Sequence, residues 1–493
     1  MKKLNIVFLT TFIVLLLLPA LTIPLFYSTE NTENRELALF PTLRTEDGSW
    51  NAEYTDQIND WVMDHIGFRK LLVQANSTLQ SKVFGQSSEE SIILGKNGWL
   101  FYSDTAKDYM NISTISERNV NNISHSLAMV QDYVHAQGSE FVVAFIPNKN
   151  SLYGENMPFY YITQQADGNL ELLQQAMARD GVTYADVQAA FRAQEEVLYQ
   201  AADSHWNYKG ALLGYNTILD AAGWEHNRFE DLTFSPVQDW DSDLARMLYS
   251  GSAEPGLQLY PDITFHYTYT SHEQQVDSIR LTTYNENGNG NVVVYRDSFS
   301  NTMQVYFAEN FENAMFSRAL PYALHYVEEQ EADLTILELV ERNLIQLSRK
   351  APMMAAPEVS LNANAQGVGS QGFSMYGRET NGFLHLYGQV PEEFLGDSYR
   401  VYLLCNVTDR DGNNQMHSFE AFPIFEQELI ADRDVNKETD NGDSTGEVTE
   451  DADNGFSIYL NAEEFSGVSS YYLVICSEDN YYASDALEPL MDE

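Results

Sequence analysis

Three short apolar runs limit most strongly what this chain can fold into. They are residues 141–146 (FVVAFI), 291–295 (NVVVY) and 332–340 (ADLTILELV). Such runs are typical of central strands in a parallel sheet that helices cover on both faces. Helical patterns are expected at residues 114–138, 169–179, 189–199, 209–222 and 302–311, and a further short strand at 182–187. Strands that alternate with helices predict an α/β domain with a mainly parallel sheet.

Two polar motifs carry the chemistry that the sequence suggests. The first is DSHW at residues 203–206, and the second is RDSF at 296–299, directly after one of the apolar runs. An aspartate two residues before a histidine, together with a serine after a strand, supplies the three groups of a nucleophilic hydrolase or acyltransferase. Ser298 is then the nucleophile, His205 the base that removes its proton, and Asp203 the group that fixes the imidazole tautomer.

The expected position of Ser298 strengthens this interpretation. A serine between a central strand and a helix N-terminus lies where backbone N–H groups can stabilise an oxyanion. Each motif also has a purely structural alternative, because serine is a favoured helix N-cap and because His205 beside Trp206 fits an ordinary turn. Both motifs are expected at C-terminal strand ends of one α/β domain, where open sheets bind ligands, and this favours the catalytic interpretation.

Other polar and aromatic side chains are expected near the same edge. The run 141–146 ends in Pro147-Asn148-Lys149-Asn150. Asn148 and Lys149 are therefore candidate substrate contacts, although loops are generally polar. Further candidates for substrate contact are Tyr102, Trp206 and Arg296.

The composition excludes some partners. The chain has 493 residues, 72 acidic and 27 basic side chains, and a formal net charge of −45. This charge argues against nucleic acid or anionic lipid as the main partner, since both are negatively charged. The charge identifies no partner, because a solvated acidic surface is the commoner reason for such a balance. No motif calls for a metal or a cofactor, and the length predicts two or three folding units.

The N-terminal residues 1–30 predict a membrane anchor. Two lysines precede an apolar run over residues 6–27, which is about the length of a bilayer-spanning helix. The lysines favour an N-terminus inside the cell and an exported remainder. A cleaved signal peptide is the alternative, although the run is long for one and lacks a convincing cleavage site. We expect a single-pass protein of the cell membrane with an extracytoplasmic bulk, or a secreted protein if the segment is cleaved.

Two further elements are expected before the α/β domain. Residues 54–72 carry an apolar stripe at helical spacing and predict one helix. Residues 91–102 contain an apolar run, then Gly-Lys-Asn-Gly, then an aromatic run. This pattern predicts a β-hairpin.

The C-terminal part of the chain differs in composition and in hydrophobic pattern. Residues 351–372 are rich in Ala, Pro, Gly, Asn and Gln and predict a linker. Alternating aromatic and β-branched runs follow at residues 382–388, 399–407, 417–423, 455–460 and 470–477. They predict a small all-β sandwich domain over residues 373–493.

Two features inside this region leave alternatives open. Residues 431–454 form an acidic, low-complexity insert, which favours a disordered loop over a metal site. Cys405 and Cys476 can form one disulfide or remain two buried thiols. The thiols are favoured, because two cysteines do not make a disulfide scaffold.

Seven short pieces, taken in order, resemble a known family. They are NTENRELALFP (31–41), WVMDHIGFR (61–69), GKNGWLFY (95–102), FIPNKNSLY (145–153), DSHWNYKGA (203–211), YRDSFSN (295–301) and ELVERNL (338–344). The set resembles the SGNH-hydrolase-like proteins of the alginate O-acetyltransferase superfamily, and within it the bacterial "DHHW" proteins. The pieces cover residues 31–350.

The resemblance implies a flavodoxin-like, three-layer α/β domain of SGNH type over residues 31–350. It also implies Asp203, His205 and Ser298 as a catalytic triad. Two positions depart from the family pattern: Ser204 replaces a second histidine, and Arg296 stands where many SGNH enzymes have glycine. The arginine can reshape the oxyanion side or bind an anionic sugar.

The function implied is extracytoplasmic O-acetylation of a cell-surface or secreted polysaccharide. The acyl donor would be delivered by a membrane-bound acyltransferase, and the N-terminal helix would hold the protein at the membrane. With water as the acceptor, the same site is a carbohydrate esterase. The alternative from another class is a non-catalytic scaffold or glycan-binding protein of a surface-polymer assembly.

Overall fold

The structure, a computed structural model, describes residues 2–23, 37–45, 48–249, 253–361, 364–408, 414–425, 453–463, 465 and 468–491. The helices are α1 (Lys2–Leu21), α3 (Tyr54–His65), α4 (Arg69–Leu79), α5 (Thr105–Tyr109), α6 (Glu117–Ala136), α7 (Lys149–Tyr153), α8 (Asn169–Asp180), α9 (Val187–Arg192), α10 (Tyr208–Ala221), α11 (Asp243–Leu248), α12 (Ser300–Asn310), α13 (His325–Glu329) and α14 (Gln346–Arg349). Shorter helical turns are the π-helical η1 (Gln80–Phe84) and the 3₁₀ turns η2 (Lys96–Gly98), η3 (Gly154–Asn156), η4 (Glu341–Asn343) and η5 (Glu392–Phe394).

The strands lie in four sheets. The first part of the chain contributes β1 (Ile92–Leu94), β2 (Leu100–Tyr102), β3 (Glu140–Ile146), β4 (Tyr184–Ala185), β5 (Phe234–Trp240), β6 (Gly256–Pro261), β7 (Thr268–Tyr269), β8 (Arg280–Tyr284), β9 (Asn291–Tyr295), β10 (Asn313–Ser317) and β11 (Leu334–Val340). The last part contributes β12 (Gln366–Gly367), β13 (Ser374–Thr380), β14 (Phe383–Gln389), β15 (Tyr399–Thr408), β16 (Asn414–Ile424), β17 (Gly455–Asn461), β18 (Val468–Ser477), β19 (Asn480–Ala483) and β20 (Leu490–Met491).

A seven-stranded sheet in the order β4-β3-β11-β9-β10-β8-β7 forms the centre of the α/β domain. The strands from β4 to β10 in this order are parallel, as predicted. The edge strands β8 and β7 are antiparallel, which the sequence did not predict. In chain order the parallel strands lie 2-1-5-3-4, whereas flavodoxin-like sheets are ordered 2-1-3-4-5. The flavodoxin-like prediction is therefore wrong in strand order, because β11 lies between β3 and β9.

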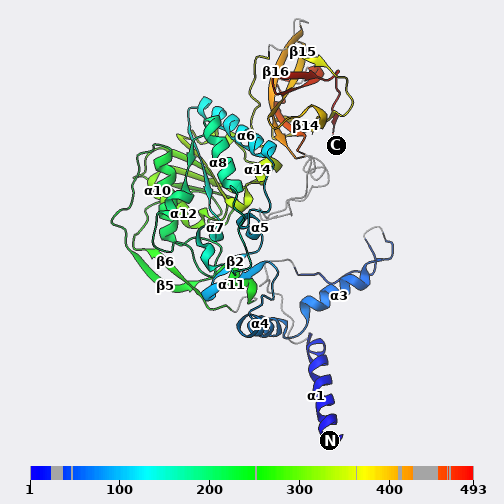
Figure 1. The fold of residues 1–493 in the computed structure, drawn as a ribbon, viewed down its shortest axis with the longest axis vertical. Helices are drawn as coiled ribbons and strands as arrows, with labels where there is room; N and C mark the ends of the chain where they lie inside the picture. The colour runs from blue at the N-terminus through cyan, green and yellow to red at the C-terminus, as the bar shows by residue number, and fades with distance from the viewer. Residues whose placement is uncertain are drawn as a thin grey trace.

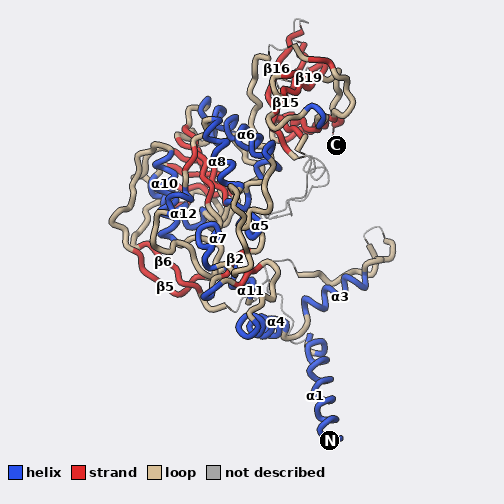
Figure 2. The backbone as a smooth tube through the Cα atoms, viewed as in Figure 1, coloured by secondary structure: helices blue, strands red, loops and turns tan. Residues whose placement is uncertain are grey.

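The sheet is covered on both faces (Figures 1 and 2). Alternate residues of β3 point to opposite sides, as the pleat requires. Phe141, Val143 and Phe145 pack in the cluster that contains α6 and α8, and the residues between them pack in the cluster that contains α9, α10 and α12. The predicted three-layer α/β architecture is thus confirmed, and the continuous apolar runs reflect burial on both faces.

Some elements differ from the sequence prediction. The helix expected over residues 54–72 is two helices, α3 and α4, because Phe68 adopts a left-handed conformation with φ of 61°. The helix expected over residues 189–199 is shorter and begins earlier, as α9. The predicted hairpin is present, with β1 and β2 paired antiparallel from Ile92 opposite Tyr102 to Leu94 opposite Leu100.

The strands β12 to β20 form one nine-stranded sheet, in which the long strand β16 pairs with both β15 and β17. The five runs predicted as strands are confirmed. This β region has a core of its own, which includes Leu403, Ile458 and Leu473. Its Tyr387, Phe422 and Ile424 pack instead in the cluster on the α6 side of the α/β domain. Arg118 of α6 also pairs with Asp453 at 2.6 Å. Most of the acidic insert predicted at 431–454 lies outside the described residues.

The two cysteines are free thiols. Cys405 lies buried in β15, and Cys476 lies half-buried in β18. They are not directly opposite each other, since Cys405 pairs with Tyr471 and Cys476 pairs with Arg400. The favoured prediction of two thiols agrees with this arrangement.

The N-terminal helix α1 is 20 residues long and projects from the base of the molecule in Figure 1. Among the described residues, no helix has the combination of length and apolar character that a membrane span requires. The anchor expected at residues 1–30 therefore stays a prediction.

Candidate active site

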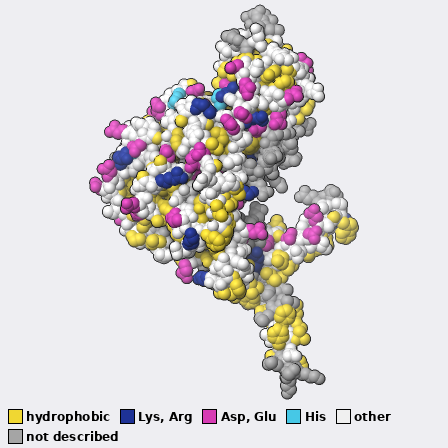
Figure 3. Space-filling view, viewed as in Figure 1, with side chains coloured by type: hydrophobic (Ala, Val, Ile, Leu, Met, Phe, Trp, Pro, Cys, Tyr) yellow, Lys and Arg dark blue, Asp and Glu magenta, His cyan; other side chains and the backbone are white. Residues whose placement is uncertain are grey.

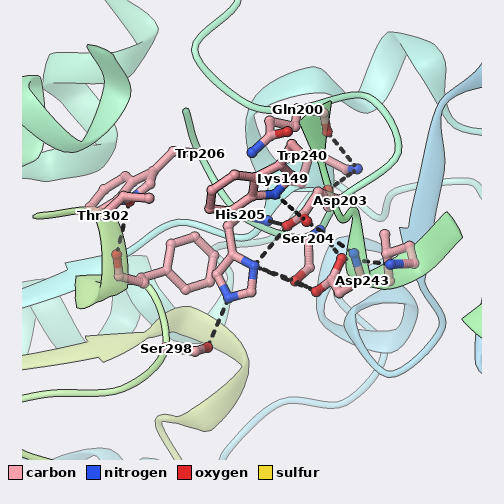
Figure 4. A network of polar contacts seen from close by, with 12 residues as sticks. Lys149, Gln200, Asp203, Ser204, His205, Trp206, Trp240, Asp243, Ser298 and Thr302 are labelled. Carbon is pink, nitrogen blue, oxygen red and sulfur yellow. Dashed lines mark hydrogen bonds and ion pairs between the residues drawn. The ribbon is translucent and has the colours of Figure 1, made fainter. Parts of the chain in front are cut away.

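The structure brings Asp203, His205 and Ser298 into one hydrogen-bonded line (Figure 4). Nε2 of His205 lies 2.8 Å from Oγ of Ser298, and Nδ1 lies 2.8 Å from Oδ1 of Asp203. The aspartate is buried, and the other two side chains are half-buried. These are the contacts that a nucleophile, a base and an orienting carboxylate need.

The motif around His205 builds the start of α10. Asn207 accepts a hydrogen bond from the N–H of Gly210 at 2.9 Å and so caps the helix. Glycine is required there, because a Cβ would lie 2.7 Å from a neighbouring backbone carbonyl oxygen. Trp206 pairs with Tyr199 in a short antiparallel bridge. The loop between them is thus closed into a compact turn.

Four donors surround the carboxylate of Asp203. Its Oδ1 accepts from the backbone N–H and from Nδ1 of His205, at 2.9 and 2.8 Å. Its Oδ2 accepts from the indole N–H of Trp240 and from the backbone N–H of Asp243, both at 3.0 Å. Burial alone would raise the pKa of Asp203, but these contacts hold it well below its usual range. The carboxylate is therefore charged at neutral pH.

The contact between Asp203 and His205 also raises the pKa of His205. Burial alone would lower that pKa, but the hydrogen bond to Asp203 and its negative charge outweigh the burial and the opposing charge of Arg342. The imidazole packs against the ring of Phe299, with centroids 4.7 Å apart. A neutral imidazole is the form that accepts a proton from Ser298.

The neighbour of Ser298, Asp297, fixes the turn. Asp297 accepts hydrogen bonds from the N–H of Phe299 at 2.8 Å and from the N–H of Val340 at 2.7 Å. The N–H of Ser298 has no hydrogen-bond partner within the described part of the chain. The hydroxyl of Ser298 contacts His205 and caps no N–H of α12, so the helix-cap alternative is wrong. The N–H of Ser298 is left available for an oxyanion.

An arginine without a counter-ion lies beside these groups. Arg342 follows β11, and its guanidinium carbon lies 5.7 Å from the ring centre of Phe299 and 5.8 Å from that of Tyr102. It forms no ion pair with any described residue, and its Nε is buried without a hydrogen-bond partner. An uncompensated guanidinium in this position is suited to a negatively charged group. The motif at 338–344 contains this arginine, but the sequence alone gave it no role.

Asp243 is a further carboxylate that the sequence analysis missed. It accepts a hydrogen bond from the N–H of Ser204 at 2.8 Å and another from the Ser204 hydroxyl, and its Oδ2 lies 3.5 Å from Nδ1 of His205. Burial and the charge of Asp203 raise its pKa. No motif marks Asp243, because only the folding of β5, β6 and α11 over the loop places it there.

The ligand atoms of Asp203, His205 and Asp243 all lie within 4.8 Å of one another, which is close enough for a metal ion. The donors present argue for another use. Nδ1 of His205 and the N–H of Asp243 already point at the carboxylate oxygens of Asp203, together with the indole of Trp240. This donor set fits a hydrogen-bonded triad better than a metal centre.

Asn148 and Lys149, predicted as substrate contacts, are buried, with 1% and 5% of their surface exposed. The ammonium of Lys149 donates to three backbone carbonyls within residues 200–203, at 2.6 to 3.1 Å. Burial lowers its pKa to about 7. The N–H of Asn148 donates to Glu341. In this structure the two residues hold the loop at residues 200–203 and the sheet edge, and substrate contact by either of them stays a prediction.

Trp206 and Arg296 are also buried, and substrate contact by them likewise stays a prediction. The indole N–H of Trp206 donates to Oγ1 of Thr302 at 3.0 Å, inside the core. The guanidinium of Arg296 donates to Oδ1 of Asn301 at 2.6 Å and to a backbone carbonyl. Tyr102, in contrast, is half-buried and lies against the unpaired guanidinium described above.

A second buried carboxylate, Glu341, ties this edge of the sheet together. Its Oε2 accepts from the N–H of Asn148 at 2.6 Å and from the hydroxyl of Ser151 at 2.8 Å. Burial, helped by the nearby charge of Asp108, raises the pKa of Glu341 to about 8.

Replacing Glu341 by glutamine is expected to stabilise the protein at alkaline pH. The folded pKa of about 8 lies above the ordinary 4.5, so the stability that proton binding contributes is complete below pH 4.5 and is lost as pH rises to about 8. Each pH unit in this window costs up to about 1.4 kcal/mol. In thermal unfolding, E341Q should have a higher Tm than wild type at about pH 8 and a similar Tm at about pH 5. Equal Tm values at both pH values would contradict this assignment.

The fold and the site together define an α/β domain that holds a serine, a histidine and an aspartate in hydrogen-bond contact. Residues 92–330 match the family described as "SGNH hydrolase-like domain, acetyltransferase AlgX". The resemblance predicted from the seven sequence pieces is thus confirmed.

Individual relatives match part of this chain, and the chain spans less than half the length of the curated relative that it matches. The "Probable alginate O-acetylase AlgJ" of Pseudomonas syringae pv. tomato is 25% identical over 170 residues, which are 33% of this chain and 40% of that protein. A DHHW family protein of Eubacterium siraeum is 16% identical, with 51% of this chain and 94% of that chain covered and a TM-score of 0.40. The O-acetyltransferase domain of Pseudomonas putida AlgJ is 16% identical, with 52% and 92% covered and a TM-score of 0.35.

Proposed function

We propose that this protein is an extracytoplasmic serine O-acetyltransferase that acts on a polysaccharide. The observation that carries the proposal is the line of hydrogen bonds from Asp203 through His205 to Ser298. The match of residues 92–330 to an acetyltransferase family and the similarity to AlgJ support the acetyl group and the polysaccharide acceptor. Attachment through residues 1–30 and an acyl donor delivered by a membrane-bound acyltransferase belong to the same proposal.

The first half of the reaction forms an acyl-enzyme. His205 removes the proton of Ser298 while Oγ attacks the carbonyl carbon of the donor. The negative charge that develops on the carbonyl oxygen is stabilised by the free N–H of Ser298. The tetrahedral intermediate collapses, the donor's leaving group takes the proton from His205, and the acetyl group stays on Ser298.

The second half transfers the acetyl group. A sugar hydroxyl gives its proton to His205 and attacks the acyl carbonyl. The ester bond to Ser298 breaks, and the serine recovers the proton from His205. Water in place of the sugar makes the same site an esterase, which is the second candidate activity within this mechanism.

Arg342 supplies a charge that the triad lacks. Its guanidinium lies near Phe299, next to the imidazole, and lowers the pKa of His205. We assign it to the oxyanion or to an anionic group of the substrate.

Replacing Arg342 by glutamine is expected to lower kcat/KM for ester turnover by roughly 10²-fold, as expected for loss of an oxyanion donor. The pH profile provides a separate readout. Because the arginine lowers the pKa of His205, its removal should move the acid limb of the profile to higher pH. Arg192→Gln, on α9, is the matched control and should change neither quantity. An unchanged acid limb in R342Q would show that the charge of Arg342 does not act on His205.

A non-catalytic scaffold is the rival function. Hydrogen-bond distance between Ser298 and His205 favours the enzyme over this alternative. The β12–β20 region, as a separate glycan-binding module, would fit either function. Incubation of the full chain with a chromogenic acetyl ester, followed by intact-mass spectrometry, tests the proposal. An acetyl adduct on Ser298 supports it, whereas a folded protein without adduct or turnover favours the scaffold.

A further inference from the structure

The helix α4 and the turn η1, residues 69–84, are amphipathic, but their apolar side is exposed to solvent and their polar side faces the protein. Their exposed side carries five large apolar side chains with 48% to 67% of their surface exposed: Leu71, Leu72, Leu79, Val83 and Phe84. The small side chain of Ala75 lies exposed between them. A helix that packs on a protein core normally turns this stripe inward.

The inward side of the same helix is polar. Ser77 is fully buried, and its Oγ accepts from Ser88 at 2.8 Å. Ser81 lies one turn further on, and its hydroxyl donates to the carbonyl oxygen of Ser77 at 2.6 Å and lies 3.2 Å from the hydroxyl of Tyr249. Hydrogen bonds therefore hold the helix to the domain, and its apolar stripe points away from it.

The charge of this segment is opposite to that of the whole chain. Residues 66–88 contain Arg69, Lys70 and Lys82 and no acidic residue, although the chain has 72 acidic and 27 basic side chains. Lys82 is exposed beside the apolar stripe. The net charge that argues against anionic lipid for the molecule as a whole is thus reversed at this site.

The position of α4 points to the same kind of partner. Figure 1 shows α4 at the base of the domain, at the end from which α1 projects, and Figure 3 shows hydrophobic side chains gathered at this end of the molecule. An apolar stripe of this size flanked by basic residues is the pattern of a helix that lies in a membrane interface.

We propose that α4 and η1 lie in the headgroup layer of an anionic bilayer, with Leu72, Leu79 and Val83 directed into the acyl chains. Lys82, which is exposed beside the stripe, then faces the lipid headgroups. This surface is separate from any span through α1 and does not depend on the acetyltransferase activity.

Such docking would bring the candidate active site close to the membrane. Tyr249, which contacts Ser81, directly follows α11, and α11 carries Asp243 beside His205. The chain of contacts from the lipid-facing helix to the imidazole therefore passes through one short helix.

A fluorescent label at residue 79 tests this proposal. The full chain carries Cys476→Ser and Leu79→Cys, with Cys405 buried and unreactive, and is labelled with the environment-sensitive dye NBD. It is reconstituted into vesicles of phosphatidylcholine with or without phosphatidylglycerol. We expect blue-shifted emission that brominated lipids quench and aqueous iodide does not, more strongly with phosphatidylglycerol. The matched control is Met416→Cys, an exposed apolar position on β16 at the far end of the molecule, which should stay accessible to iodide.

A second set of variants excludes an effect of α1 alone. Leu72→Ser with Val83→Ser, in the Leu79→Cys background, should abolish the lipid quenching while α1 is unchanged. Iodide access at residue 79 equal to that at residue 416 would overturn the proposal. So would a blue shift without vesicles together with sedimentation as a dimer, since the stripe would then bind a second copy of the chain.

Discussion

Ser298→Ala is expected to abolish acylation and to reduce ester turnover by roughly 10⁴-fold or more, to the level left by binding and oxyanion contacts alone. The reason is that Oγ of Ser298, 2.8 Å from Nε2 of His205, is the atom that forms the covalent bond in the proposed mechanism. Intact-mass spectrometry after incubation with a chromogenic acetyl ester should show one acetyl adduct in wild type and none in the variant.

The fold should survive this change. Ser298 is half-buried, and its hydroxyl has only the imidazole as a side-chain partner among the described residues. Ser235→Ala, on the exposed strand β5, is the matched control and should keep wild-type turnover. Full acylation of a well-folded Ser298→Ala variant would exclude Ser298 as the nucleophile.

Asp203→Asn is the second substitution with a large expected effect. The carboxylate accepts four hydrogen bonds, and an asparagine NH₂ group would face donors at one of its two oxygen positions. The imidazole would then lose the tautomer that can deprotonate Ser298, and ester turnover should fall by roughly 10⁴-fold.

The pH profile of the Asp203→Asn variant gives a second, independent readout. Asp203 raises the pKa of His205, so wild-type activity should be lost as pH falls through a value above the ordinary 6.5. The Asp203→Asn variant lacks this charge, so the pKa of His205 should fall. The residual activity of the variant should therefore be lost at a lower pH than the activity of wild type. A limb that does not move would mean that His205 does not act as the base. Circular dichroism and thermal unfolding would separate this result from simple unfolding.

Much of the α/β architecture can be predicted from the sequence. The continuous apolar runs of β3, β9 and β11 are apolar on both faces because helices cover both sides of the sheet. The long strands β15, β16 and β18 are equally clear from their alternating aromatic and β-branched residues. The antiparallel edge β8–β7 and the place of β11 between β3 and β9 are not, since strand order depends on contacts between distant segments.

The candidate site, like the fold, could be predicted from the sequence only in part. Asp203, His205 and Ser298 could be named because two short motifs contain the right chemical groups. Ser298 follows β9 as expected, whereas Asp203 and His205 lie in the loop between α9 and α10, so the strand end expected for them is wrong. The sequence did not show that Lys149 and Arg296, which are polar residues near the site, are buried and donate hydrogen bonds to backbone carbonyls. Nearness along the chain does not show whether a side chain points to solvent or into the core.

The sequence by itself determined which residues can do the chemistry, because the spacing of an aspartate and a histidine, and a serine after a strand, are local properties of the chain. Only the tertiary structure decided that these groups meet at 2.8 Å, that Asp243 and Trp240 complete the surroundings of Asp203, and that Arg342 lies unpaired beside them. It also decided that α4 turns its apolar side outward. The physical reason is that hydrogen bonding and burial depend on which distant segments are packed together, and no local pattern encodes that choice.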